Sequence, residues 1–168
     1  MKEIYLAGGC FWGTEHYFKQ INGVISTEVG YANGNTNNPK YEEVYTDKTG
    51  YAECVKVVYD PCIITLKYLI ELFFRSIDPL SLNQQGNDCG TRYRTGVYYT
   101  DSEDIKAIEL VFKSIEMAIG EPLAVEFEPL KNFYAAEEYH QDYLDKNPNG
   151  YCHIPMELMM MARLANKR

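Results

Sequence analysis

The sequence predicts an α+β fold, a two-layer sandwich in which helices pack on a mixed, mainly antiparallel sheet, with long irregular loops between the elements. Strand-like and helix-like segments alternate along the chain without a strict β-α-β repeat, which favours one mixed sheet over a parallel one. The 168 residues suit a single domain that buries its core without disulfides. We therefore expect one domain over residues 1–168, with residues 147–168 as a C-terminal tail.

Runs of β-branched and aromatic residues predict the strands, and apolar residues three or four positions apart predict the helices. The clearest strand covers residues 52–59 and is ended by Asp60-Pro61, while the apolar stripe of residues 66–77 ends at Asp78-Pro79. The other elements expected in the first half are strands at 2–7 and 24–31, helices at 12–21 and 41–45, and a polar loop at 32–40.

The second half begins with a polar, glycine-containing loop expected at residues 82–94. The clearest helix covers 103–119, because a capping sequence precedes it and Gly120 follows it. We expect residues 132–146 to form another helix, followed by the turn-rich sequence Asn-Pro-Asn-Gly at 147–150. The remaining expected elements are strands at 96–99 and 123–127 and an amphipathic helix from Pro155 onward.

The charge of the chain excludes some partners. The net charge of −8 disfavours contact with nucleic-acid phosphates and with an anionic membrane surface, so we expect neither partner. The apolar run at residues 4–7 is shorter than the core of a secretory signal. A cytoplasmic location is therefore expected.

The cysteines do not fit a disulfide framework or a metal site. There are five of them, an odd number, and no two are spaced as Cys-x-x-Cys. With only three histidines, the chain offers no ligand pattern for a metal, and we expect none. The cysteines are better interpreted as separate thiols.

Cys10 lies in the most informative segment, Gly8-Gly9-Cys10-Phe11-Trp12-Gly13, where a strand ends and a helix begins. The N–H groups and the dipole of the helix would favour a thiolate there and lower the cysteine pKa. Phe11 and Trp12 would form an apolar wall beside it. The alternative is a buried and inert cysteine in a glycine-rich turn.

Glu53 shares one face of its strand with Val55 and Val57, so we expect it to point inward. Burial would raise its pKa and keep it protonated near neutral pH, as a proton donor requires. The alternative is a strand face that meets solvent.

Four weaker signals are open to structural explanations. The hydrogen-bonding loop at residues 84–94 could be a solvated turn, and Cys152, which could travel on the flexible tail to another sulfur, could be an ordinary surface thiol. His140 is expected on a helix surface, and Cys54 is expected to pack on its strand.

Five sequence blocks in order resemble the A type of peptide methionine sulfoxide reductase, a class whose chemistry is the reversal of methionine oxidation. The blocks are GCFWG at 9–13, GYANGNTNNPKYEEV at 30–44, TGYAECVKVVYDP at 49–61, GNDCGTRYR at 86–94 and YHQDYLDKNPNGYC at 139–152. The resemblance covers nearly the whole chain and implies a single catalytic domain with a ferredoxin-like core.

The resemblance also implies a role for each matching residue. Cys10 matches the nucleophile, Glu53 the acid that protonates the sulfoxide oxygen, and Cys152 the resolving cysteine. The residues that match the substrate pocket are Phe11 and Trp12 around the methyl group, Tyr41 and Tyr93 as hydrogen-bond partners of the oxygen, and Asp88 as an orienting carboxylate. Many relatives have His at the positions of Tyr51 and Cys89, so the resolving thiol could be Cys152 or Cys89.

The implied reaction is the reduction of methionine-S-sulfoxide, free or in oxidised proteins, through a sulfenic acid on Cys10 and then a disulfide. No bound cofactor is implied; an external dithiol such as thioredoxin would reset the enzyme, which is expected to be a monomer. Two alternatives are open: a thiol peroxidase, and a redox-sensing binding module that oxidises without turnover.

Overall fold

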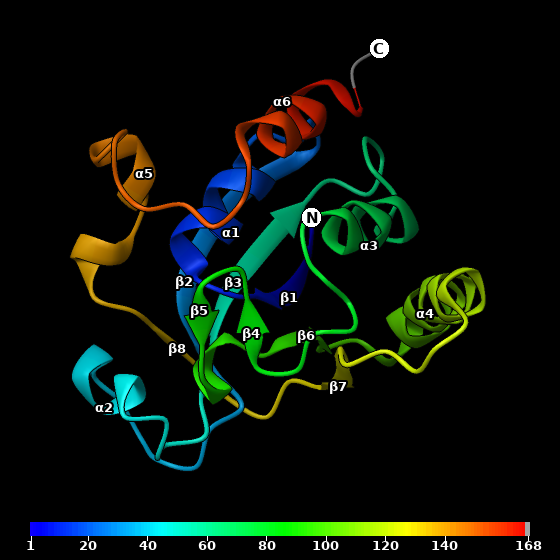
Figure 1. The fold of residues 1–168 in the computed structure, drawn as a ribbon. Coiled ribbons are helices and arrows are strands. Elements are labelled where there is room, and N and C mark those ends of the chain that lie inside the picture. Colours follow the sequence, from blue (N-terminus) through cyan, green and yellow to red (C-terminus); the bar gives the residue numbers. More distant parts are fainter. Residues whose placement is uncertain (167–168) are drawn as a thin grey trace.

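A six-stranded sheet runs through the centre of the protein in the computed structural model, which describes residues 1–166 (Figure 1). Its strand order is β7-β6-β1-β3-β2-β8, and every neighbouring pair is antiparallel except β6 and β7. The strands are β1 (Lys2–Gly8), β2 (Val24–Ala32), β3 (Ala52–Tyr59), β6 (Thr95–Tyr99), β7 (Glu126–Pro129) and β8 (Phe133–Ala135). The predicted mixed, mainly antiparallel sheet is confirmed.

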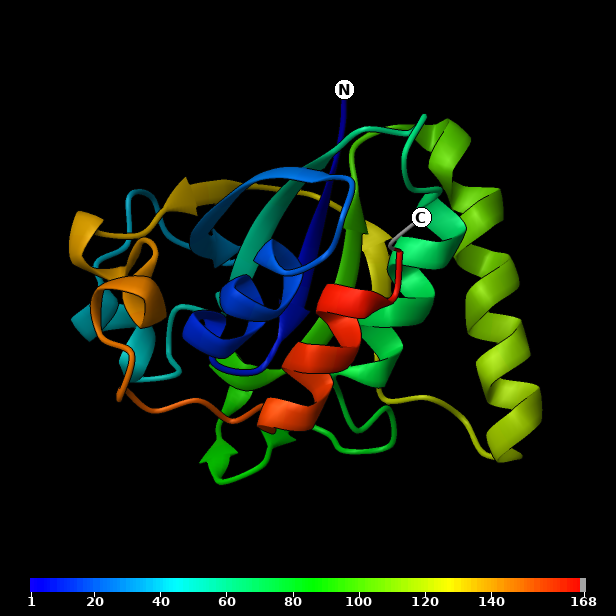
Figure 2. The same ribbon diagram turned by 90° about the horizontal axis from the view of Figure 1, so that it is seen from above.

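The central part of the fold has the ferredoxin-like order β1-α1-β2-β3-α3-β6, with the strands side by side as β6-β1-β3-β2. Helices α1 (Phe11–Lys19) and α3 (Leu66–Arg75) cover one face of this sheet, α4 (Ile105–Ile119) packs outside α3, and α6 (Met156–Leu164) packs against α1 (Figure 2). The short helices are α2 (Tyr41–Tyr45) and α5 (Tyr143–Lys146), and a small hairpin joins β4 (Gln84–Gln85) to β5 (Asp88–Cys89).

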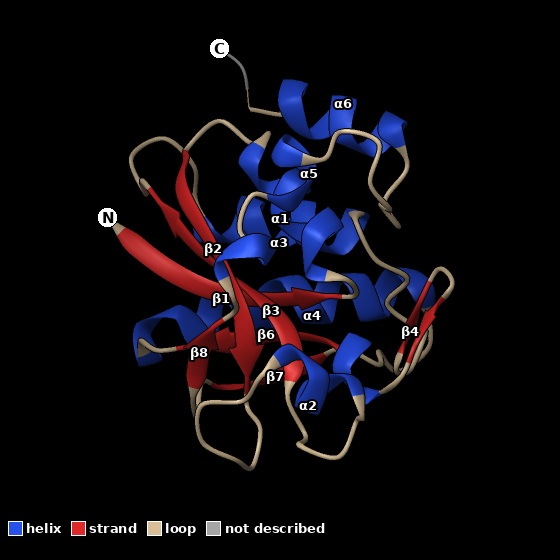
Figure 3. Ribbon diagram, turned by 90° about the vertical axis from the view of Figure 1, so that its left-hand side faces the viewer, coloured by secondary structure: helices blue, strands red, loops and turns tan. Residues whose placement is uncertain are grey.

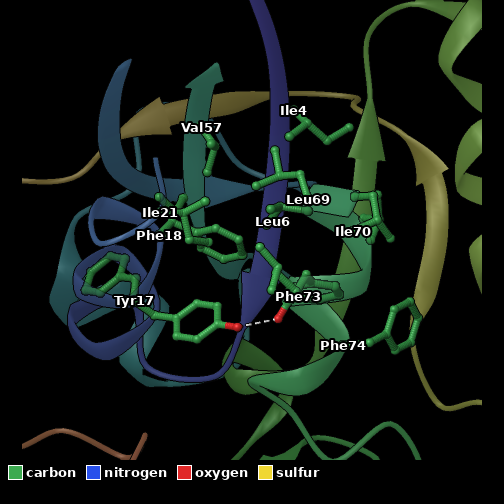
Figure 4. Close-up of a cluster of buried hydrophobic side chains, with 14 of the residues drawn as sticks. Ile4, Leu6, Tyr17, Phe18, Ile21, Val57, Leu69, Ile70, Phe73 and Phe74 are labelled. Atoms are coloured by element: carbon green, nitrogen blue, oxygen red, sulfur yellow. Dashed lines mark hydrogen bonds between the residues drawn. The ribbon is translucent and has the colours of Figure 1, made fainter. Parts of the chain in front are cut away.

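The main core lies between the sheet and the two helices that cover it (Figure 4). Alternate residues of β1, Ile4 and Leu6, face Phe18 of α1 and Phe73 of α3, and all four are fully buried. The Tyr17 hydroxyl donates a hydrogen bond of 2.6 Å to the backbone carbonyl of Leu72. This bond ties the C-terminal half of α1 to α3.

The opposite face of the sheet carries a second, smaller core. Tyr5, Ala7, Cys54 and Tyr98 pack there under the segment that runs from β7 to β8, which Figure 3 shows on the side of the sheet away from α1. Cys54 is fully buried on its strand, as the sequence predicts.

The helix predicted at residues 132–146 is wrong. The segment instead pairs with β2 as strand β8, makes a single 3₁₀ turn at Glu138–His140 and ends in the short α5. Its polar side chains bond distant parts of the chain: the Glu137 carboxylate accepts from the Tyr31 hydroxyl at 2.8 Å and from the Tyr41 backbone N–H at 2.9 Å. These tertiary hydrogen bonds outweigh the modest helix propensity of the segment. The predicted strand at 123–127 also begins later, at Glu126.

Within residues 1–166, no helix is both long enough and apolar enough to cross a membrane.

Candidate active site

Cys10 lies at the N-cap of α1, directly after the turn that ends β1. Gly9 makes this turn with φ of +90°, a conformation that favours glycine. The turn places the Cys10 side chain between the sheet and the first turn of the helix, where it is only 6% exposed. The position at a strand-to-helix junction is the one that the sequence predicts.

The expected lowering of the Cys10 pKa is wrong. Burial raises the pKa of the thiol well above its usual value, and the nearby Glu53 carboxyl raises it further. Hydrogen bonds from the backbone N–H groups of Trp12 and Gly13 act in the opposite direction but do not offset the desolvation. Cys10 is therefore a protonated thiol in the substrate-free protein.

Glu53 points from β3 into the space beside the start of α1, as its strand alternation predicts. Its side chain is 2% exposed, and one carboxyl oxygen accepts a hydrogen bond of 3.1 Å from the Phe11 backbone N–H. Burial raises the pKa of Glu53 to about 8, against smaller lowering effects from the Phe11 N–H and from Arg92. At neutral pH the group is a carboxylic acid next to the Cys10 thiol.

Two tyrosine hydroxyls lie close enough to Glu53 and Cys10 for the charges to interact. Burial, followed by Glu53 and Cys10, raises the pKa of Tyr41 to about 12. Burial and Glu53 likewise raise the pKa of Tyr93, which is 8% exposed. Both hydroxyls stay protonated and can donate hydrogen bonds to a bound oxygen atom.

Arg92 positions this side of the site, a contribution that the sequence analysis missed. Its guanidinium lies between the rings of Tyr45 and Tyr93, 4.4 Å and 4.3 Å from their centroids. It also donates to the Asp47 carboxylate at 2.6 Å. The ion pair joins two loops and holds the Tyr93 ring against a fixed cation.

An aromatic wall stands next to Cys10. Phe11 is buried, and the Trp12 ring is stacked on Tyr143 with a centroid distance of 3.7 Å. The Trp12 indole N–H donates a hydrogen bond of 2.9 Å to Nδ1 of His140. His140 is 1% exposed and also packs on Phe11 and Tyr41, so its prediction as a helix-surface residue is wrong. The loss of the predicted helix at 132–146 is what turns His140 inward.

The tail brings Cys152 to the same end of α1. A Cβ atom added to Gly13 would lie 3.2 Å from the Cys152 sulfur, so this sulfur packs against the first helical turn. Cys152 is half-buried and contacts the Ile154 carbonyl at 3.3 Å. The residue before it, Tyr151, donates a hydrogen bond of 3.0 Å to the Asp88 carboxylate on the hairpin.

Cys89 faces away from this arrangement. In the hairpin it is paired with the exposed Gln84, whereas Asp88 is paired with the buried Gln85. Successive strand residues point to opposite sides, so Asp88 faces the tail and Cys89 faces solvent. The structure thus places Cys89 outside the site. It gathers the eight predicted site residues at one end of α1, and these are Cys10, Phe11, Trp12, Tyr41, Glu53, Asp88, Tyr93 and Cys152.

The family model described as peptide methionine sulfoxide reductase matches residues 2–168. The chain belongs to the peptide methionine sulfoxide reductase family. It is 56% identical over 159 residues to the peptide methionine sulfoxide reductase MsrA of Clostridium acetobutylicum, covering 95% of this chain and 98% of the relative.

Solved structures of this reductase family share the fold. Mxr1 from Saccharomyces cerevisiae in reduced form is 43% identical, with a TM-score of 0.85, and the match covers 90% of this chain and 88% of that one. Mxr1 in complex with Trx2 is 31% identical, with a TM-score of 0.60 and 84% of each chain covered. The resemblance read from the five sequence blocks is therefore confirmed for the family, and the ferredoxin-like α+β fold with it.

In this site, a buried thiol, Cys10, and an uncharged carboxyl, Glu53, lie next to each other. Such a pair can attack an electrophilic sulfur and protonate the oxygen attached to it. Among residues 1–166, no group of three or more His, Cys, Asp or Glu side chains is arranged to hold a metal ion. Sequence analysis missed the contributions of Arg92 and His140, because nothing in the sequence pattern distinguishes these two from surface residues.

Proposed function

We propose that the protein reduces methionine-S-sulfoxide, free or in oxidised proteins, to methionine, with Cys10 as nucleophile and Glu53 as acid. The observation that carries this proposal is the protonated Glu53 carboxyl beside the Cys10 thiol, next to the aromatic side chains of Phe11 and Trp12. A sulfoxide oxygen leaves sulfur only when it is protonated, so the reaction needs an acid that keeps its proton at neutral pH.

In the first half of the reaction, Cys10 sulfur attacks the sulfoxide sulfur while Glu53 donates its proton to the oxygen. The attack forms a transient S–S bond between Cys10 and the substrate. This bond and the S–O bond of the substrate then break, methionine leaves with the S–S electron pair, and the hydroxyl is transferred to Cys10 as a sulfenic acid. The thiol proton of Cys10 replaces the one that Glu53 gave, so no proton is gained or lost overall. Tyr41 and Tyr93 stabilise the charge that develops on oxygen, and Asp88 orients polar groups at the rim.

Phe11 and Trp12 are proposed to enclose the methyl group of the substrate. The Trp12 ring is fixed on one face by Tyr143 and at its N–H by His140. A fixed apolar wall for the methyl group, with the acid held separately on β3, supports selection of one sulfoxide epimer, and membership of the family supports the S form.

In the second half, we propose that Cys152 attacks the sulfenic acid and forms a disulfide, which a dithiol such as thioredoxin then reduces by exchange. The yeast relative has been solved in complex with Trx2, which supports this reductant. Cys152 is favoured over Cys89 because its sulfur packs on the first turn of α1, whereas Cys89 points to solvent. No bound cofactor is needed for these steps.

The same features support a single catalytic domain, with residues 147–168 as the tail that supplies Cys152. Every proposed site residue comes from one chain, which supports a monomer as the working unit. The five cysteines are all free thiols, as is usual in a reducing compartment, and this supports the cytoplasm.

The test is steady-state turnover of a methionine-S-sulfoxide substrate with dithiothreitol and with thioredoxin, with hydrogen peroxide as the competing substrate. We expect Cys10→Ser to be inactive and Cys152→Ser to work with dithiothreitol only, while Cys89→Ser, the matched control thiol, works with both. Sulfoxide turnover by Cys10→Ser would overturn the proposal. Turnover of peroxide alone would indicate a peroxidase, and stoichiometric oxidation without turnover would indicate a sensor.

A further inference from the structure

The imidazole of His153 lies across the two glycines that flank Cys10. A Cβ atom added to Gly9 would lie 3.0 Å from its Nε2, and one added to Gly13 would lie 2.8 Å from its Nδ1. Real Cβ contacts are longer than this, so the ring occupies the space that glycine leaves on both sides of the nucleophile. No other side chain contacts both glycines this closely.

The contacts of His153 fix which ring nitrogen carries the proton. Nε2 lies 2.8 Å from the Gly8 backbone carbonyl, and a carbonyl can only accept a hydrogen bond, so Nε2 is the donor. Nδ1 is buried and has no hydrogen-bond partner within residues 1–166. Burial lowers the pKa of His153, so the ring is neutral and Nδ1 carries a free lone pair.

The Cys152 sulfur lies beside this nitrogen, and in the reduced protein its thiol donates to the Ile154 carbonyl. Both Nδ1 of His153 and the sulfur of Cys152 lie within 3.2 Å of the point where a Gly13 Cβ would be. Burial raises the pKa of the Cys152 thiol, so at neutral pH it keeps its proton. A thiol attacks another sulfur only as thiolate, so the disulfide-forming step needs a base at this place.

We propose that Nδ1 of His153 is the base that takes the proton of Cys152 when this residue attacks the sulfenic acid on Cys10. The inference rests on the proposed function, in which Cys152 is the resolving thiol. The S–H bond of Cys152 breaks, an S–S bond to Cys10 forms, and the S–O bond of the sulfenic acid breaks. The hydroxide that leaves receives the proton that His153 took, so the products are a disulfide and water.

The groups around His153 are compatible with this role. Asp88 on β5 is the charged group that acts on the imidazole, and it raises the pKa only partly against the desolvation. The Cys152 thiol lies beside the ring at Gly13, and the Tyr151 hydroxyl is bonded to Asp88. Gln85 on β4, which packs on Gly9, is uncharged. No cation faces the ring in this part of the described chain to suppress its basicity.

The test is a rapid-quench single turnover of the full-length reduced enzyme with methionine-S-sulfoxide, in which released methionine and lost thiols are measured separately. His153→Gln can keep the hydrogen bond to the Gly8 carbonyl through its amide N–H but supplies no base. We expect methionine release to stay within about twofold of the wild type and disulfide formation to slow about 100-fold or more. His16→Gln, at a half-buried position further along α1, is the matched control.

The pH dependence separates a base from a structural support. In the wild type, the rate of disulfide formation should be constant at pH values above the lowered pKa of His153 and should fall at pH values below it. In His153→Gln it should rise about tenfold per pH unit across the neutral range, because only free hydroxide then removes the thiol proton. A His153→Gln variant with the wild-type rate and pH profile overturns the inference. Disulfide formation in Cys152→Ser would instead overturn the proposed resolving thiol.

Discussion

A carboxyl oxygen of Glu53 lies 3.1 Å from the backbone N–H of Phe11, the residue that follows Cys10. This single hydrogen bond links the acid to the turn that carries the nucleophile. It favours the ionised form of Glu53, but the complete burial of the group has the larger effect, and the pKa is raised to about 8. The geometry of the pair therefore sets both the reactivity and the stability of the protein.

Glu53→Gln tests the proton donor. The acid form of the wild type is lost as pH rises through about 8, so methionine release in a single turnover should decline across that range. The variant should be slower by about 10² to 10⁴ at pH 7 and should lack this decline. Glu28→Gln, on an exposed part of β2, is the control. A decline near pH 8 that persists in Glu53→Gln would assign it to another group.

The same substitution should stabilise the fold at high pH. The folded-state pKa of Glu53 is raised above its unfolded value of about 4.5. The contribution of Glu53 to the free energy of unfolding is therefore fully present below pH 4.5 and is lost as the pH rises toward 8. Glu53→Gln keeps an oxygen acceptor for the Phe11 N–H and removes the desolvated charge. Urea unfolding should show a gain of about 2–4 kcal/mol at pH 8 and little change at pH 4.5. An equal gain in the free energy of unfolding at pH 8 and at pH 4.5 would contradict the titration of Glu53.

His140→Leu should disturb the aromatic wall through Trp12. It leaves the half-buried indole N–H without a protein acceptor, at a cost of about 1 kcal/mol, and frees the ring to tilt. We expect kcat/KM for the sulfoxide to fall about tenfold or more, with a shift in the fluorescence of Trp12, the one tryptophan in the chain. His140→Asn keeps an acceptor near Nδ1 and should recover part of the loss. Equal rates for the wild type and His140→Leu would contradict the positioning role.

Arg92→Met should move the alkaline decline of activity to higher pH. The Arg92 cation lowers the pKa of Glu53, whereas Asp88 and Asp47 raise it. Without the cation, the charged groups that remain near Glu53 add to the effect of burial, and both raise its pKa. The apparent pKa of methionine release should therefore rise above about 8. Methionine preserves the length of the side chain between Tyr45 and Tyr93, and a pH profile unchanged from the wild type would show that Arg92 acts only through packing.

How much could be predicted from the sequence depended on the range of the interactions involved. The positions of Cys10 and Glu53 follow from a strand-to-helix junction and from strand alternation, which are local patterns. The pKa of Cys10 could not be predicted, because it depends on how completely distant segments bury the thiol.

The helix predicted at 132–146 failed for the same reason. Its place is set by the hydrogen bonds that Glu137 accepts from Tyr31 and Tyr41, about a hundred residues away in the chain. The inward positions of His140 and His153 follow from this irregular path, and Arg92 depends on a loop contact with Asp47. Local sequence carries little information on any of these contacts.

The site joins the two ends of the chain: Cys10 follows the first strand, while His140, Cys152 and His153 come from its last 29 residues. Because a domain folds as a unit, Cys10 stays uncovered in the nascent chain until the segment that carries His140 and Cys152 has been synthesised. During that time the thiol lacks the burial that raises its pKa. Synthesis of this segment thus also protects the thiol that the first strand presents.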